Sequence, residues 1–454
     1  MKREKAAKIL RAALFLLLLI FVLKNASFLL TPKTAERKYR RFFSEKAGFD
    51  VLFTGISLTM VGVYPMELYD EYGLTSFNMG ESGCRPQAAY WALKMALDDC
   101  DPSLVVIDVR RMDLTEKTLP EYARHTLDAF PLSLTKCRAA FDLYEDFADR
   151  MSMIFPIVSY HYRWSELEKS DFRVNAYRLD NGARHYMGDD LRVAQVKTYP
   201  VVPADDARPP EEVSAAYLKK MIELCRSRGI SVMLQELPCP LPEDDQRYAN
   251  GVQAVADEYG VPYLNLYHED MINYGTDFAN AKHMNDSGAR KSTHAIGAFI
   301  RDHFDIPDRR DDPSYSDWNG QLEKYMDFKK DRLKSQKKAD VFLMLLRDAR
   351  FDTGIRISAN AGCLSDGRLM ELVRNIAGEE LPLLEKAIAG GEEYRAYIRG
   401  ADGTAAESLR GDPVQLAPSD ADWQKGSSAE PPAGEMDICV FDARTGEPVL
   451  EKSF

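Results

Sequence analysis

Short apolar segments alternate with amphipathic helical segments between residues 50 and 305, and no other feature constrains the fold as strongly. The apolar segments have the composition of buried strands: VLFTG (51–55), SLVVIDV (103–109), ISVMLQEL (230–237) and VPYLNLY (261–267). Helical periodicity occupies the stretches between and after them, over residues 87–98, 214–229, 248–260 and 287–304. Strands that are joined through helices run parallel. The sequence therefore predicts an α/β fold in which helices cover both faces of a parallel sheet.

The composition also divides the chain into parts. A long stretch rich in Pro, Asp and aromatic residues interrupts the α/β pattern and is typical of a lid over the edge of a sheet. After Phe304 a Pro- and Asp-rich linker leads into a charged helix, and the remaining chain predicts a small α+β unit with closing strands around Arg444-Thr445-Gly446. Residues 416–435 within that unit are expected to form a polar loop. We expect four parts: an N-terminal segment (1–32), an α/β domain (45–305) with a lid-like insertion (111–212), a linker with a charged helix (306–340) and a C-terminal α+β domain (341–454).

The N-terminus indicates where the protein is located. Five basic residues precede or enter a charge-free apolar run, Ala12 to Leu23. The longer segment 9–30 can span a bilayer if Arg11 and Lys24 extend toward the interfaces. The absence of a small-x-small cleavage site favours an uncleaved signal anchor, with a cleaved signal peptide as the rival interpretation. Since positive flanks stay in the cytoplasm, we expect a single-pass membrane protein whose chain after about residue 32 is extracytoplasmic.

Charge and cysteine usage exclude several classes of function. The net charge of −12 is unfavourable for general binding to nucleic acid. The seven cysteines are scattered and have no CxxC spacing, which argues against a zinc site. No Walker-type loop and no GxGxxG motif follows a strand. We therefore expect no nucleic-acid partner, no metal and no cofactor.

A serine lies where the fold would place a ligand site. In an open α/β sheet, that site lies beyond the carboxyl ends of the strands. Ser57, in Gly55-Ile56-Ser57-Leu58, follows the first strand directly. A serine hydroxyl needs a base to act as a nucleophile, and His283 is placed at the same edge, between the last strand and the last helix. Gly80, after a short strand at 75–78, would offer its backbone N–H to an oxyanion.

These segments resemble the conserved blocks of the SGNH/GDSL hydrolase family. The Gly55–Leu58 tetrapeptide is similar to the first block, the Gly80 turn to the second and Asn280-Ala281-Lys282-His283 to the last. YPMELYDEYGLTSFNMGESG, YHYRWSEL and HMNDSGARK resemble a membrane-anchored, extracytoplasmic bacterial branch, which is related to the D-alanyl transfer protein of teichoic-acid modification. The resemblance implies a flavodoxin-like three-layer α/β/α fold. It also implies a serine esterase or acyltransferase with Ser57 as nucleophile, His283 as base, and the N–H groups of Ser57 and Gly80 in the oxyanion hole.

The chain departs from the family pattern at two places. The family has a catalytic Asp three residues before the histidine, where this chain has Asn280. An amide oxygen can fix the tautomer of the imidazole, but it cannot offset the charge of an imidazolium. Asp277, three residues earlier, is the alternative third member. The usual third block, GxND, has no counterpart: LQELPCP follows the strand at the corresponding place and contains no Asn.

Two further residues are candidates for substrate binding. Arg163 would hold an anionic group of a substrate or, as an equal alternative, a structural carboxylate. His161 lies beside it and is expected to pack or to support the site.

The C-terminal unit has a weaker resemblance of its own. MDICVFDARTGEPVLEKSF is similar to a strand pair of the interleukin-like EMT inducer domains. The resemblance implies a binding or accessory domain.

Two classes of function remain open. The first is an extracytoplasmic serine esterase or O-acyltransferase that acts on an acylated cell-envelope glycan, a similar polymer or a small ester. The second is a catalytically impaired protein of the same fold that binds a glycan or an acylated partner, as Asn280 and the missing third block would allow.

Membrane attachment is directly testable. The full-length chain is expected to sediment with membranes and to require detergent for extraction, because basic residues flank the apolar run from Ala12 to Leu23 as they flank a membrane anchor. Recovery of the chain in the soluble fraction, with its N-terminus intact by mass spectrometry, would contradict this prediction.

Overall fold

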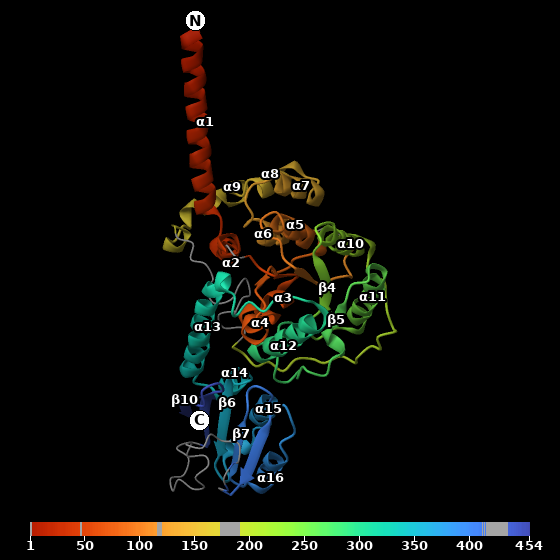
Figure 1. The fold of residues 1–454 in the computed structure, drawn as a ribbon, viewed down its shortest axis with the longest axis vertical. Coiled ribbons are helices and arrows are strands. Elements are labelled where there is room, and N and C mark those ends of the chain that lie inside the picture. Colours follow the sequence, from red (N-terminus) through yellow and green to blue (C-terminus); the bar gives the residue numbers. More distant parts are fainter. Residues whose placement is uncertain are drawn as a thin grey trace.

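The computed structural model describes residues 2–45, 48–115, 120–172, 191–410, 412, 414 and 435–454 of the chain. Within these residues, the strands form two five-stranded sheets. Figure 1 shows one sheet in the middle of the molecule and the other at the end opposite the N-terminal helix. Residues 416–434, most of the predicted polar loop, lie outside the described part of the chain.

The first sheet is parallel and has the strand order β2-β1-β3-β4-β5. Its strands are β1 (Val51–Thr54), β2 (Ser76–Asn78), β3 (Leu104–Asp108), β4 (Ser231–Glu236) and β5 (Tyr263–Asn265). In the central register, Val51 lies between Ser76 of β2 and Leu104 of β3. This order is that of flavodoxin-like folds. The predicted parallel sheet is confirmed.

Helices cover both faces of this sheet, because successive side chains of a strand point to opposite faces. Leu52, Val105 and Leu234 pack in one core with α5 (Pro86–Ala96), α10 (Glu212–Ser227) and α11 (Glu243–Tyr259). Val51, Val106 and Met233 pack in another core with α3 (Ser57–Gly62), α4 (Pro65–Tyr72) and α12 (Asp286–His303). The expected three-layer α/β/α architecture is therefore confirmed.

The second sheet is antiparallel, in the order β10-β9-β6-β7-β8. Its strands are β6 (Phe351–Ile357), β7 (Tyr394–Ile398), β8 (Ala405–Leu409), β9 (Met436–Asp442) and β10 (Pro448–Ser453). Side chains of α14 (Ala339–Leu345), α15 (Gly367–Ile376) and α16 (Pro382–Gly390) share its core. The expected smaller α+β unit is present, and β7, β8 and α16 are elements that sequence analysis left unassigned.

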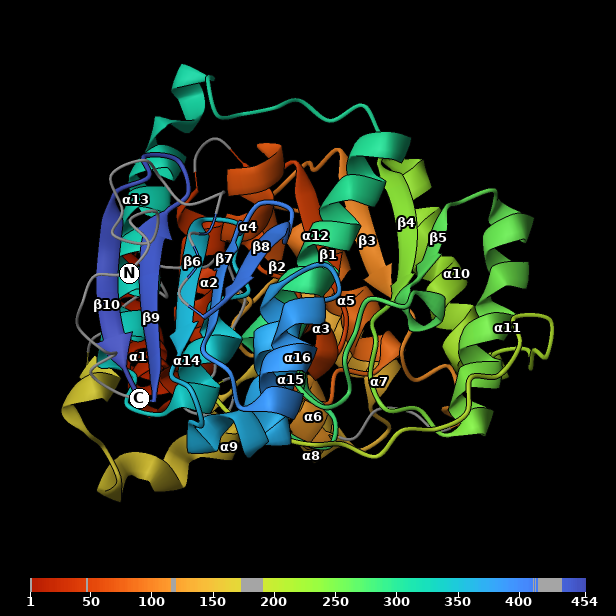
Figure 2. The ribbon, with the colours of Figure 1, turned by 90° about the horizontal axis from the view of Figure 1, so that it is seen from below.

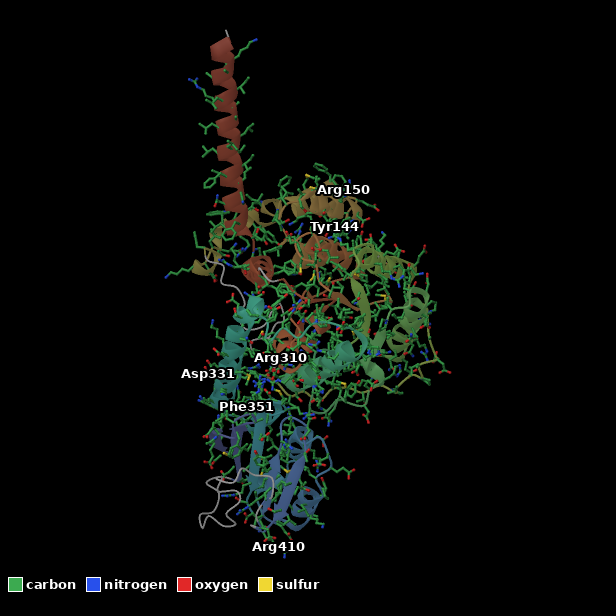
Figure 3. All side chains as sticks on the ribbon, in the orientation of Figure 1. Tyr144, Arg150, Arg310, Asp331, Phe351 and Arg410 are labelled. Carbon is green, nitrogen blue, oxygen red and sulfur yellow. The ribbon has the colours of Figure 1, made fainter. Side chains whose placement is uncertain are left out.

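The N-terminal helix α1 (Lys2–Leu30) projects from the rest of the molecule, and its apolar window is unburied. Figure 3 shows side chains of α1 extending into open space on both sides of the helix in this view. The stretch Lys5–Leu30 is long and apolar enough to cross a membrane. By length and composition, α1 is compatible with the expected signal anchor.

A layer of short helices lies beside the lower end of α1 (Figure 1). The layer consists of α6 (Pro120–Leu127), α7 (Leu134–Leu143), α8 (Phe147–Ile154), α9 (Ile157–Tyr160) and the 3₁₀ turns η1 (His161–Ser165) and η2 (Lys169–Phe172). It packs on α5 and on α1. The remaining elements are α2 (Lys33–Ser44), η3 (Leu266–His268), η4 (Pro313–Tyr315), α13 (Ser316–Ser335) and η5 (Gly362–Ser365).

A buried cluster of charges joins the α/β unit to the C-terminal unit. Lys329 of α13 lies 2.8 Å from Glu67 of α4 and 2.7 Å from Asp348, which precedes β6. Arg290 of α12 pairs with Asp348 and Asp286 at 2.5 Å each. Burial alone would raise the pKa of Glu67, but the Lys329 ammonium and the Arg290 guanidinium lower it below its ordinary value. The two cations therefore keep Glu67 ionised although its side chain is buried.

Replacing Lys329 by Met tests this junction. The change leaves Glu67 and Asp348 short of a cation in a buried site, so we expect a loss of about 3–5 kcal/mol in the free energy of unfolding. Lys330→Met is the matched control, because Lys330 is partly exposed and pairs with Asp442 at 3.4 Å, where we expect a loss of less than about 1 kcal/mol. Denaturant unfolding in detergent measures both variants, and equal losses would argue against a structural role for the cluster.

Candidate active site

Ser57 is presented by a tight turn between β1 and α3. Gly55 is required there, since a Cβ atom at this position would lie 2.4 Å from the Cβ of Asp108. Asp108, at the end of β3, is buried and accepts hydrogen bonds from the Thr59 hydroxyl of α3 and from the backbone N–H of Arg110, the latter at 2.7 Å. Burial raises the pKa of Asp108, against the lowering effect of these hydrogen bonds. The carboxyl end of the neighbouring strand thus clamps the turn that carries the serine.

His283 meets Ser57 across the carboxyl edge of the sheet. The distance between Ser57 Oγ and His283 Nε2 is 2.8 Å. The loop before α12 folds back on itself through a bridge between Phe278 and Met284, and the N–H of Ala279 donates to the carbonyl of His283 at 2.9 Å. This narrow hairpin fixes the backbone from which the imidazole extends. The predicted proximity of the two side chains is therefore observed.

The side chain of Asn280 determines the direction of the hydrogen bonds. Its Oδ1 atom accepts from the backbone N–H groups of Lys282 at 3.0 Å and His283 at 3.1 Å, so this atom must be the amide oxygen. The same oxygen lies 3.2 Å from His283 Nδ1, and that nitrogen must therefore carry the proton. The lone pair of Nε2 then faces Ser57 and can accept the proton of its hydroxyl. A serine nucleophile requires such an arrangement with its base.

Asp277, the alternative third member, is occupied elsewhere. Its carboxylate is buried and lies 2.7 Å from Lys291 Nζ. It also accepts hydrogen bonds from Ser287 at 2.8 Å and from Asn375 of the C-terminal unit at 3.0 Å. The structure therefore brings Asn280, and not Asp277, to the Nδ1 side of the imidazole.

The expected role of Gly80 is not supported by the structure. Its N–H donates to the side-chain oxygen of Asn78 at 2.9 Å, and Lys38 donates to its carbonyl. A Cβ atom at Gly80 would lie 2.6 Å from the backbone nitrogen of Met60 in α3. Gly80 thus allows the turn after β2 to pack closely against α3, and its N–H is already used.

His161 and Arg163 lie at the foot of α1. Arg163 donates to the carbonyl of Leu30 at 2.6 Å and pairs with Asp171 at 3.2 Å. His161 is exposed, and its Nδ1 lies 2.9 Å from the carbonyl oxygen of Val158. Of the two alternatives for Arg163, the structure has the structural carboxylate, and Arg163 also holds the last residue of α1 through the carbonyl of Leu30. The expected role of His161 in substrate binding stays a prediction.

Ser57 and His283 line a cavity of about 780 Å³. This volume is typical of a ligand site and is much larger than an acetyl group requires. Basic side chains outnumber acidic ones in its lining. The basic ones are Arg85, Arg110, Arg111, Lys197 and Lys282, and the acidic ones are Asp113 and Asp245. Both acidic groups are paired, Asp113 with Arg111 at 3.0 Å and Asp245 with Arg110 at 3.2 Å. The cavity therefore has an excess of positive charge in a chain that is acidic overall.

Several lining residues were not found by sequence analysis. Tyr122 comes from α6, and Lys197 and Tyr199 come from the segment before α10. All three belong to the expected lid-like insertion, whose pattern carries no motif that would mark them. Lys282 had a signal, since it directly precedes the candidate base. Among the described residues, no group of three or more His, Cys, Asp or Glu side chains is arranged to hold a metal ion.

A buried acid lies behind the cavity wall. Glu236, at the end of β4, is buried and lies 3.6 Å from the guanidinium of Arg110. Burial raises the pKa of Glu236 to about 8, in spite of the lowering effect of Arg110. The carboxyl group is therefore protonated in the folded chain over a range of pH in which an exposed glutamate is ionised.

Comparisons with known proteins add distant likenesses only. A scan against protein-family models finds no match, and a search of curated proteins finds no similar sequence. Among solved structures, the chain is similar to a putative acylhydrolase from Bacteroides fragilis, with 14% identity, a TM-score of 0.30, and coverage of 60% of this chain and 98% of that one. It is also similar to a GDSL-like lipase from Bacteroides thetaiotaomicron, with 13% identity, a TM-score of 0.28, and coverage of 60% of this chain and 100% of that one. The third is an acetyl xylan esterase from Butyrivibrio proteoclasticus, with 9% identity, a TM-score of 0.23, and coverage of 56% of this chain and 63% of that one. At these scores the geometry of the site, and not the names of these proteins, carries the functional argument.

Glu236 predicts a specific dependence of stability on pH. The pKa of Glu236 is about 8 in the folded chain and near 4.5 when the side chain is exposed. Between pH 4.5 and about pH 8, the folded state therefore retains a proton that the unfolded state releases. The contribution to stability is therefore present at low pH and is lost as pH rises through about 8. Glu236→Gln should flatten this decline in a series of thermal unfolding curves, whereas Glu269→Gln, at an exposed position, should not. An unchanged slope in Glu236→Gln would contradict the assignment.

Proposed function

We propose that the protein is a membrane-anchored, extracytoplasmic serine ester hydrolase or O-acyltransferase that acts on an acylated cell-envelope glycan or a similar polymer. One observation carries the proposal: Ser57 Oγ lies 2.8 Å from an imidazole nitrogen whose lone pair faces it. The hydrogen bond from Nδ1 to Asn280 holds the imidazole in that tautomer. The apolar helix α1 supports the membrane anchor, and the positive residues at its start support an extracytoplasmic location for the rest of the chain.

The proposed reaction uses these groups in two half-reactions. His283 Nε2 takes the proton of the Ser57 hydroxyl while Oγ attacks the ester carbonyl, which forms a tetrahedral oxyanion. The backbone N–H of Ser57, at the first position of α3, has no acceptor within the helix and is the proposed oxyanion donor. The imidazolium then protonates the leaving alkoxide, and an acyl-serine remains. Water or an acceptor hydroxyl, deprotonated by His283, releases the acyl group and restores Ser57.

The charge of the cavity supports a substrate that carries negative groups near the ester. Lys197, Lys282 and Arg85 line the cavity, and Tyr122 and Tyr199 add aromatic surface to it. Basic side chains attract carboxylates and phosphates, and aromatic faces provide apolar contact for sugar rings. The size of the cavity leaves room for several groups of a polymer beside the acyl chain.

A second candidate function is a non-catalytic binding protein that retains the fold. Two observations favour it. Asn280 supplies no charge to stabilise an imidazolium. The N–H of Gly80, the expected second oxyanion donor, is held by Asn78. In that case the cavity would bind an acylated or anionic glycan without cleaving it.

Two substitutions distinguish the candidates. Ser57→Ala should abolish ester hydrolysis and labelling by a fluorophosphonate probe. Asn280→Asp preserves an oxygen for the N–H groups of Lys282 and His283 and adds the missing charge, so turnover should rise, by at most about 10⁴-fold. The readout is the rate of hydrolysis of an acetyl ester over a range of pH.

The matched control is Asn319→Asp, which adds a charge away from the cavity at another amide that accepts a hydrogen bond, from Tyr69. Turnover should not change in this variant. If no variant shows Ser57-dependent hydrolysis or labelling, and no acyl transfer to an added glycan acceptor, the enzyme hypothesis fails and the binding function stands.

A further inference from the structure

The outer surface of the helical layer beside α1 is unusually apolar. Outside α1, most of the large apolar side chains that the structure leaves exposed lie between residues 132 and 172. Trp164 is 73% exposed and Leu134 is 79% exposed. We call this surface the aromatic ledge and define it by six exposed side chains: Leu134, Phe147, Phe155, Tyr162, Trp164 and Phe172.

The helices of the ledge are apolar on two sides. In α7, Ala139, Ala140 and Leu143 are buried in the core shared with α5, which is the ordinary inner face of a surface helix. Its outer face nevertheless carries Leu134 and Phe141, spaced seven residues apart on one side of the helix. A helix that meets only water on its outer side would be polar there. The apolar outer face of α7 therefore indicates that this face contacts an apolar surface or an apolar solvent.

The position of the ledge identifies that partner. α1 contacts α9, η1 and η2 directly. Arg163, one residue from Trp164, donates to the carbonyl of Leu30, where the candidate membrane span ends. Figure 1 shows α7, α8 and α9 in a row that extends sideways from the lower end of α1, and Figure 2, which views the molecule along α1, shows them spread to one side. The ledge thus lies at the depth where the chain would leave a bilayer.

We propose that the aromatic ledge inserts into the interface of the same bilayer that α1 spans, and that the protein is held at the membrane by two contacts. This inference goes beyond the proposed activity and rests only on the proposed membrane span of α1. Trp and Tyr favour the membrane interface, where their rings contact acyl chains and their polar atoms contact water. Interfacial helices enter the boundary of headgroups and acyl chains by about 5–10 Å, within reach of exposed side chains such as Trp164.

The ledge is also connected to the site. α6 contacts α8 in the layer and contributes Tyr122 to the cavity that Ser57 and His283 line. In Figure 2, β3 and β4 are seen lengthwise while α1 is seen end-on, so the strands run crosswise to α1. With the ledge in the interface, the carboxyl edge of the sheet opens along the membrane surface. An anchor of one helix alone would leave the α/β unit free to rotate relative to the membrane. The second contact fixes the distance of the α/β unit from the bilayer and its orientation.

Trp164 provides a direct test. The full-length chain is placed in vesicles of phosphatidylcholine and phosphatidylglycerol whose acyl chains carry bromine, either near the headgroup or near the bilayer centre. The span itself contains no tryptophan, and Trp91 and Trp318 are buried. Trp423, outside the described residues, is replaced by Phe in every variant. We expect loss of Trp164 emission, greater with shallow than with deep bromine, and we expect the loss to disappear in Trp164→Phe.

The control variant combines Trp164→Phe with Val201→Trp. Val201 is 62% exposed, and the next residue donates from its backbone N–H to Gln246 of α11, on another side of the α/β unit. No quenching is expected there. If the protein floats with the vesicles but the emission of Trp164 is not quenched, the proposal is overturned. It is also overturned if Trp at position 201 is quenched as strongly as Trp164. A chain that does not float contradicts the span and the ledge together. Unquenched Trp164 in a chain that sediments as a dimer would assign the ledge to a second copy instead.

Discussion

The parallel direction of the first sheet is the constraint on which the site depends. Because all of its strands point the same way, their carboxyl ends meet at one edge, and the residues that follow them are brought together whatever their distance in sequence. Ser57 follows β1, Asp108 ends β3, and His283 lies in the loop between β5 and α12. Asp108 adds precision to this general placement, since it holds the start of α3 through Thr59 while Gly55 lets the two strands' ends approach.

The junction between the two sheets supports the same edge. Asp286 and Arg290, which belong to the buried charge cluster, lie in the first turns of α12, only a few residues after His283. Asp277, just before the hairpin, is held by Lys291 and by Asn375 of the C-terminal unit. Both flanks of the histidine loop are therefore fixed by contacts with the junction. Ion pairs of this kind add little net stability, but the loss of one partner is costly, so they hold one arrangement of the units.

The amide at position 280 separates two properties that usually occur together in such sites. Its oxygen orients the imidazole as a carboxylate would, and it completes a turn with two backbone N–H groups. It provides no negative charge to stabilise the imidazolium. Under the proposed function, the basic side chains of the cavity hold an anionic substrate against Ser57, but they do not replace the missing negative charge.

The sequence by itself determined the layers and the two side chains that meet at the carboxyl edge of the sheet, because strand–helix alternation and the position of a residue directly after a strand are local properties. Ser57 and His283 could be predicted for that reason, although their catalytic roles stay predictions. Only the tertiary structure decided the partners of polar groups. Asn78 takes the N–H of Gly80 because its own amide bridges the carbonyls of Thr59 and Val63, and Arg163 pairs with Asp171. A hydrogen bond depends on ångström distances between segments far apart in the chain, and no pattern along the sequence encodes those distances.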